Sequence, residues 1–371
     1  MEIRHFFVFL CDYMKKSNKK SALQEISGIN EPDRLNKKIT GSLKSKRKLP
    51  DVNLLVDKIL SGDKIYLSKA ITLIESTHPK HYLLGQEVIK KCLPQSGNSV
   101  RIGITGVPGV GKSTFIERLG KYYTSQGHKV AVLAIDPSSS LSKGSILGDK
   151  TRMESLSRDK NAYIRPSASG NHLGGVARKT RETILLCEAA GFDKIIIETV
   201  GVGQSETIAH SMVDFFLLLK LAGAGDELQG IKRGIIEMAD LIVINKAEKE
   251  NINSAKLAQK AFENALHFYP PKDNGWIPKV LLASALLNKG INNIARSIDS
   301  YIQLTKQKGF FEKKRKEQDV YWFKETVNRE ILEKFYQQTQ VQKLFEKFVQ
   351  EINTNKITAF EAAEKLLKFN P

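Results

Sequence analysis

Nine consecutive residues combine glycines, a lysine and two hydroxyl side chains at the spacing of a phosphate-binding loop. The segment fits the pattern G-x-x-x-x-G-K-[ST] and comprises Gly106, Val107, Pro108, Gly109, Val110, Gly111, Lys112, Ser113 and Thr114. The glycines let backbone N–H groups point at phosphate oxygens, beside the positively polarised start of the following helix. Lys112 is then expected to reach the β and γ phosphates, and the Ser113 hydroxyl to bind Mg²⁺. A glycine-rich turn is the alternative, but an apolar run before the segment and a helical pattern after it favour the P-loop.

Two further apolar runs end in carboxylates. Asp136 follows residues 132–135, and Glu198 lies near the end of residues 194–199, with Gly201 shortly after it. A carboxylate beside the phosphates can hold Mg²⁺, and a glycine amide after it can contact the γ phosphate. The alternative role for either acid is to cap the start of a helix.

Six residues after two other apolar runs have the layout of a guanine-specificity pair. They are Asn245, Lys246 and Glu248 after residues 241–244, and Ser284, Ala285 and Leu286 after residues 280–282. In that layout an asparagine amide and a lysine stem hold the purine, an acid accepts from N1 and N2, and an alanine N–H donates to O6. Guanine carries that donor pair and adenine does not. The acid is Glu248, where the usual pattern has Asp, so its effect on selectivity stays open.

The elements that must position these residues alternate between short apolar runs and helical patterns. The predicted strands are residues 100–105, 129–135, 162–165, 194–199, 215–221, 241–245 and 280–283. Such alternation predicts an α/β fold, here a P-loop domain with a doubly wound, mainly parallel sheet. Ligands of such sheets bind at the carboxyl ends of the strands, where the polar motifs lie.

The rest of the chain divides around this core. Residues 1–50 are Lys-rich and weakly periodic, which predicts a basic, flexible tail. Residues 51–98 show helical spacing, residues 99–305 form the nucleotide-binding domain, and residues 306–371 form a helical extension. The apolar stripes of that extension need a surface to pack on, which is either the main domain or a second copy of the chain.

Composition excludes some classes of protein and leaves others open. The chain has 58 Lys and Arg against 40 Asp and Glu, a net charge of +18, which suits polyphosphate, acidic partners or nucleic acid. Three cysteines without a C-x-x-C pair favour a reducing, cytoplasmic location. No apolar run approaches the ~20 residues of a membrane-spanning helix.

Three further segments join these motifs in resembling the MeaB/ArgK family of GTPases. They read GSILGDKTRM at 144–153, GGVARKTRE at 174–182 and AGAGDELQGIK at 222–232. The resemblance extends over about residues 54–304. It implies GTP hydrolysis, with GTP and GDP as ligands, and a chaperone that gates adenosylcobalamin loading and protects methylmalonyl-CoA mutase or a related acyl-CoA mutase. The mutase, and not this chain, would carry the cobalamin, and the C-terminal helices would form a homodimer.

The resemblance also assigns roles to individual residues. It places Mg²⁺ among Ser113, Asp136, Asp149 and Glu198. It puts Asp149 and Arg152 on one switch, and Lys232 on an additional switch at residues 222–232 that faces the mutase. Lys112, Asp149, Arg152 and Lys232 form the implied catalytic set.

Two other functions compete with this interpretation. A small-molecule kinase would use the same P-loop for ATP, and preference for ATP over GTP would support it. A nucleic-acid-binding NTPase would suit the positive charge, but the basic runs lack the interleaved aromatic residues typical of such surfaces.

Overall fold

The computed structural model describes residues 50–135, 153–166, 173–199, 205–223 and 233–369. It contains two compact units, residues 50–324 and the residues from 325 onward. None of the described helices combines the length and hydropathy that crossing a bilayer demands.

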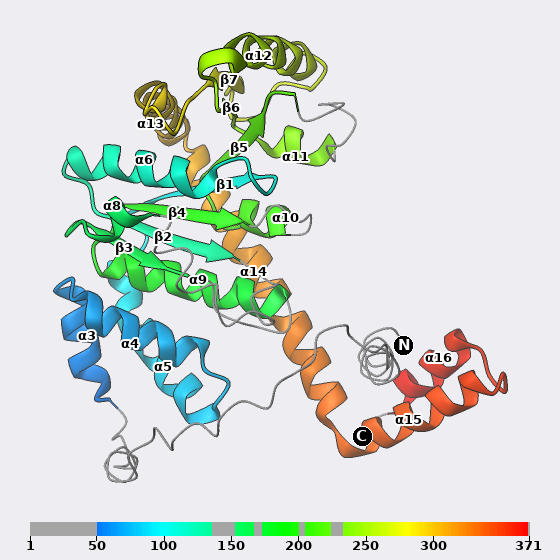
Figure 1. The fold of residues 1–371 in the computed structure, drawn as a ribbon. Helices are drawn as coiled ribbons and strands as arrows, with labels where there is room; N and C mark the ends of the chain where they lie inside the picture. Colours follow the sequence, from blue (N-terminus) through cyan, green and yellow to red (C-terminus); the bar gives the residue numbers. More distant parts are fainter. Residues whose placement is uncertain (1–49, 136–152, 167–172, 200–204, 224–232, 370–371) are drawn as a thin grey trace, which may run out of the picture. The chain divides into compact units, whose positions relative to one another are not determined.

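A seven-stranded sheet forms the centre of the first unit (Figure 1). Its strands are β1 (Val100–Gly106), β2 (Val130–Ile135), β3 (Ala162–Arg165), β4 (Lys194–Thr199), β5 (Phe215–Leu221), β6 (Leu241–Asn245) and β7 (Lys279–Leu282). They lie in the order β3-β2-β4-β1-β5-β6-β7, and every pair of neighbours is parallel. The predicted α/β fold with a doubly wound, mainly parallel sheet is confirmed.

Helices cover both faces of this sheet, which explains why most residues of its strands are apolar on both faces. One face packs against α6 (Lys112–Ser125), α8 (Glu154–Ser157) and α13 (Ile291–Gln307). The opposite face packs against α9 (Leu173–Ala189), α10 (Ser205–His210), α11 (Arg233–Met238) and α12 (Ile252–Leu266). Successive strand residues point to opposite faces, so Ile196 joins the first core while Ile195 and Ile197 join the second.

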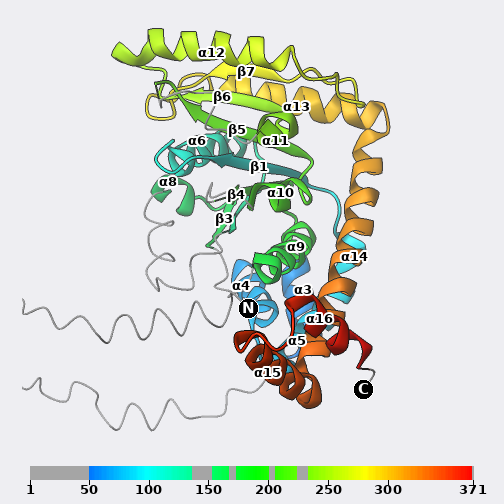
Figure 2. The same cartoon turned by 90° about the vertical axis from the view of Figure 1, so that its right-hand side faces the viewer.

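Three N-terminal helices form a further layer, and they pack on α9 (Figure 2). They are α3 (Val52–Leu60), α4 (Lys64–Glu75) and α5 (Pro79–Cys92), followed by a short 3₁₀ turn, η1 (Leu93–Gln95). The Asp51 and Asp63 carboxylates accept hydrogen bonds from the first N–H groups of α3 and α4, which satisfies donors that a helix start leaves unpaired. Lys64 Nζ donates to the carbonyls of Lys160 and Ala162, which ties α4 to the edge strand β3.

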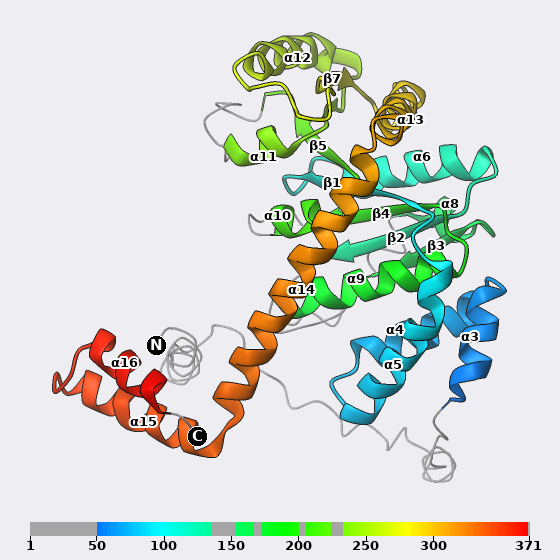
Figure 3. The ribbon, with the colours of Figure 1, turned by 180° about the vertical axis from the view of Figure 1, so that it is seen from behind.

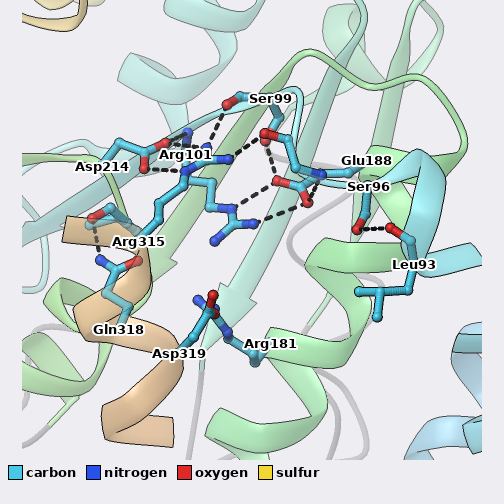
Figure 4. Close-up of polar contacts among 12 residues, drawn as sticks. Leu93, Ser96, Ser99, Arg101, Arg181, Glu188, Asp214, Arg315, Gln318 and Asp319 are labelled. Atoms are coloured by element: carbon cyan, nitrogen blue, oxygen red, sulfur yellow. Dashed lines mark hydrogen bonds and ion pairs between the residues drawn. The ribbon is translucent and has the colours of Figure 1, made fainter. Parts of the chain in front are cut away.

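The first part of α14 (Phe310–Gln337), through Lys324, crosses the amino-terminal ends of β1 and β5 (Figure 3). Figure 4 shows the buried polar network that holds it there. Arg315 donates from Nε and Nη2 to the two carboxylate oxygens of Asp214, at 2.9 and 2.7 Å, and from Nη2 to the Ser99 carbonyl. Arg101 pairs in the same way with Glu188 of α9, at 2.8 and 3.0 Å. The network lies at the end of the sheet opposite to the polar motifs.

The second unit consists of the end of α14, α15 (Thr339–Asn353) and α16 (Ala359–Lys368). Among its described residues, only Val341, Ala362 and Leu366 are buried. Large apolar side chains remain exposed on all three helices: Ile331, Leu332, Phe345, Phe360 and Leu367. The unit therefore has a small core and an apolar surface left over.

Candidate functional site

The phosphate loop joins β1 to α6 at the carboxyl end of the central strand. Gly106 ends β1, and a Cβ there would lie 2.6 Å from the Leu219 carbonyl oxygen, so only glycine lets β1 and β5 approach this closely. Gly111 precedes α6 with φ near 91°, in the left-handed region that glycine adopts at little cost. Val110 between them is fully buried and anchors the loop, while Pro108 and Gly109 are exposed at its tip.

Lys112 folds back over this loop. Its Nζ donates to the Gly106 carbonyl at 2.7 Å and to the Val107 carbonyl at 3.3 Å. Burial lowers the pKa of Lys112, and the charges of Glu198 and Glu206 act in the opposite direction without cancelling that effect. The charged form of a partly buried ammonium with a lowered pKa is stabilised by an anionic ligand such as phosphate.

The oxygens suited to a divalent cation lie beside the lysine. The Ser113 hydroxyl donates to Glu198 Oε1 at 3.4 Å, so the first turn of α6 and the end of β4 bring two hard oxygen donors together. Glu198 lies opposite Ile104 of β1 and Ala134 of β2 in the sheet register. Hydroxyl and carboxylate oxygens are the protein ligands that Mg²⁺ prefers, so this pair fits that ion.

The base-recognition residues meet on the other side of the phosphate loop. Asn245 ends β6 almost fully buried, and its Nδ2 donates to the Val110 carbonyl at 2.8 Å. Its Oδ1 accepts from the Ala285 N–H at 3.2 Å. That distance is at the upper end of the ordinary range for an N–H···O bond, and a backbone N–H can be shared between two acceptors. Asn245 thereby fixes the phosphate loop and the loop after β7 relative to each other.

Glu248 supplies an unpaired acceptor at this place. Its Oε2 is buried and has no hydrogen-bond partner among the residues that the structure describes. A buried carboxylate oxygen without a donor costs free energy, so it indicates a ligand carrying N–H groups. Lys246 precedes it with φ near 57°, and its stem passes within 4.0 Å of the Cβ position of Gly111. These two residues fit the acid and the lysine stem of a guanine site.

The loop after β7 is held as a small hairpin. Ser284 and Lys289 exchange two backbone hydrogen bonds at 3.0 Å, and the Leu287 N–H donates to Ser284 Oγ. Leu286 between them is 65% exposed.

The structure thus brings together the described residues that the sequence assigned to phosphate, base and metal. Thr114 lies in the first turn of α6 with Lys112 and Ser113. Five other predicted site residues lie outside the described parts of the chain: Asp136, Asp149, Arg152, Gly201 and Lys232.

Sequence reasoning missed one charged neighbour of the site. Glu206 on α10 is buried, and its charge acts on Lys112. Its only signal in the sequence is its place five residues after Gly201, which does not show that the carboxylate turns inwards.

Comparison with known proteins extends these observations. A family model described as methylmalonyl-CoA mutase-associated GTPase MeaB matches residues 67–340. GTPase ArgK of Escherichia coli K12 is 45% identical over 293 residues, which cover 76% of this chain and 88% of the relative. The mouse protein called methylmalonic aciduria type A homolog, mitochondrial, is 42% identical over 327 residues, 85% of this chain and 79% of the relative. A crystal structure described as LAO/AO transport system kinase has a TM-score of 0.71 at 35% identity, covering 86% of this chain and 99% of that one.

Proposed function

The chain belongs to the MeaB family of methylmalonyl-CoA mutase-associated GTPases, and from this membership we propose that it is a chaperone of such a mutase. In this proposal GTP binding and hydrolysis gate the loading of adenosylcobalamin into methylmalonyl-CoA mutase or a related acyl-CoA mutase. The same cycle protects or reactivates the mutase. The cofactor stays with the mutase.

One observation supports the proposed binding of a guanine nucleotide more than any other. The unpaired, buried Oε2 of Glu248 lies in the sequence N-K-A-E, at the motif position whose acid would accept hydrogen bonds from guanine N1 and N2. Adenine has no such pair of donors there, so this oxygen would remain unpaired with ATP. The kinase alternative shares the phosphate loop, and base preference is therefore the property that separates the two functions.

The described residues have defined tasks in hydrolysis under this proposal. Lys112 exchanges its bonds to the Gly106 and Val107 carbonyls for phosphate oxygens and offsets the charge that develops on the γ group. Ser113 and Glu198 would hold Mg²⁺, with Asp136 and Asp149 as further ligands, and the ion would supply positive charge that offsets the charge of the phosphates. The Gly201 amide contacts the γ phosphate.

A cation supplied on partner binding completes the proposed site. Either Arg152 or Lys232 supplies this cation, and Lys232 lies on the switch at residues 222–232 that would face the mutase. Intrinsic turnover is then slow, because an arginine-finger type of cation contributes several powers of ten in related hydrolases.

The test compares GTP turnover by the full chain with and without an adenosylcobalamin-dependent methylmalonyl-CoA mutase. We expect the mutase to raise the GTPase rate about tenfold or more, while serum albumin at the same concentration leaves it unchanged. Equal rates with and without the mutase would refute the coupling, and hydrolysis of ATP in preference to GTP would favour the kinase.

We also propose that the chain forms a homodimer through its second unit. Phe360 is 88% exposed and Leu367 is 74% exposed, on an amphipathic helix with little of its own unit to cover it. Exposed apolar side chains of this size are typical of an interface. Light scattering should show a dimer for the full chain and a monomer for the Phe360→Asp, Leu367→Asp double variant, and an unchanged mass would contradict this interface.

A further inference from the structure

A closed ring of contacts joins the phosphate loop to the base-recognition loop. Val110 accepts from Asn245 Nδ2, and Asn245 Oδ1 accepts from the Ala285 N–H, as described above. The Ala285 carbonyl in turn accepts from Nε of Arg118, at 3.2 Å. Arg118 lies on α6, the helix that continues directly from the phosphate loop. The chain from Val110 to Arg118 therefore closes the ring.

We propose that Arg118 is a positioning residue for guanine recognition, because it holds Ala285 where its N–H can donate to guanine O6. This inference rests on the proposed guanine site and adds a residue that neither the P-loop pattern nor the base-recognition pattern contains. Arg118 does not touch the base in this proposal. It acts through the backbone of Ala285.

The other hydrogen bonds of the loop after β7 do not hold Ala285 relative to the phosphate loop. The paired bonds between Ser284 and Lys289 fix the shape of the hairpin, and the Leu287 N–H bond to Ser284 Oγ does the same. Neither reaches the phosphate loop. Ala285 also packs in the apolar core that contains Val110 and residues of α6, but among the described residues only Asn245 and Arg118 join it to these elements by hydrogen bonds.

The chemistry of Arg118 suits a positioning role. Its guanidinium is always charged, and a charged donor makes a stronger hydrogen bond to a carbonyl than a neutral one. Nε is its only atom with a hydrogen bond to a described residue, so the side chain has one structural contact of this kind. Because Arg118 is half-buried, its long stem also restricts the orientations that the head can take.

Loss of the bond between Arg118 and the Ala285 carbonyl should weaken only the contact to guanine O6. With Ala285 free to shift by a few tenths of an ångström, its bond to O6 lengthens, and N–H···O bonds weaken as they lengthen. Contacts from Glu248 to N1 and N2 lie on another loop and remain. We expect GDP affinity to fall about three- to tenfold, the worth of one ordinary hydrogen bond.

The experiment measures the affinities of GDP, 6-thio-GDP, IDP and ADP by calorimetry for the full chain and three variants. In 6-thio-GDP sulfur, a weak acceptor, replaces O6 while N1 and N2 keep their hydrogens. IDP keeps O6 and lacks the 2-amino group. Arg118→Met retains the apolar stem and removes the donor, Arg118→Lys retains a cationic donor, and Arg296→Met makes the same change at an exposed arginine of α13. Tryptophan fluorescence confirms that each variant is folded.

The proposal expects Arg118→Met to weaken GDP and IDP by the same factor and 6-thio-GDP much less. Arg118→Lys should recover part of the loss, and Arg296→Met should match the unsubstituted chain. An equal loss for GDP and 6-thio-GDP, or no loss for GDP, would overturn the proposal. If Arg118→Met does not fold, the same comparison is made with Arg118→Lys: its loss of GDP affinity should exceed its loss of 6-thio-GDP affinity. An unsubstituted chain that binds ADP as tightly as GDP would instead refute the guanine site itself.

Discussion

Replacing Arg315 by methionine should destabilise the first unit strongly and leave its nucleotide site intact. The substitution removes both bonds to the Asp214 carboxylate, which is 2% exposed, and the bond to the Ser99 carbonyl. The Asp214 carboxylate then keeps only the hydrogen bond that it accepts from the backbone N–H of Arg101, among the described residues. Stranding a buried charge in this way costs about 3–5 kcal/mol. With a urea dependence of about 3 kcal/mol per molar for a unit of this size, the midpoint should fall by about 1–1.7 M.

Urea unfolding followed by tryptophan fluorescence measures this loss specifically. Both tryptophans of the chain, Trp276 and Trp322, lie in the first unit, so the signal does not report on residues from 325 onward. The double variant Asp214→Ala, Arg315→Met should be more stable than Arg315→Met alone, because it no longer buries an unpaired charge. Arg296→Met should change the midpoint by less than the equivalent of about 0.5 kcal/mol. A midpoint for Arg315→Met within that margin, or a double variant less stable than either single one, would refute the reasoning.

Three further predictions concern the nucleotide site and acid stability. Lys112→Ala should lower the GTP hydrolysis rate about 100- to 1,000-fold in a phosphate-release assay without shifting the urea midpoint downwards, because it removes the partly buried cation that we propose binds the phosphates; a rate within tenfold would contradict this. Glu248→Gln should weaken GDP binding by about tenfold or more and leave ADP binding unchanged, and equal losses for both would exclude the role given to Glu248. Asp159 should contribute stability above about pH 4 that is lost towards pH 2, because the Lys121 hydrogen bond lowers its pKa to about 2. Asp159→Asn should remove that part of the pH dependence of the urea midpoint, and an unchanged profile would count against it.

Glu188 should add to the same loss of stability in acid. Burial raises the pKa of this carboxyl, but the Arg101 charge and the hydrogen bonds from Arg101 and Ser99 outweigh burial and lower it. A carboxyl with a lowered pKa in the folded state stabilises the fold above its ordinary range and loses that effect as the pH falls.

Local sequence patterns were sufficient to predict the sheet. They also predicted that the phosphate loop and the base-recognition residues lie close together. Strands such as residues 194–199 and 241–245 are short apolar runs between helical patterns, and parallel topology brings their carboxyl ends to one edge. Asn245 and Val110 are 135 residues apart and β5 lies between their strands, but both lie at the carboxyl ends of parallel strands and therefore at the same edge of the sheet.

The buried polar network could not be predicted in the same way. Arg315 lies in a run of lysines and glutamates that is typical of a solvated helix face, and Asp214 lies 101 residues away. Their pairing depends on where α14 crosses the sheet, which local periodicity does not specify. Arg118 was missed for a related reason. It is one charged residue on an amphipathic helix. Its proposed role depends on a hydrogen bond to the Ala285 carbonyl, and a sequence pattern does not show bonds to backbone atoms.

Calorimetric titration of the full chain with GDP and with ADP, each with Mg²⁺, tests the account at its centre. If the phosphate loop and Glu248 hold a guanine nucleotide, titration with GDP should give a saturable heat with one site per chain. The affinity for ADP should be far weaker. Equal affinities for the two nucleotides, or no heat with GDP while the protein is folded, would contradict it.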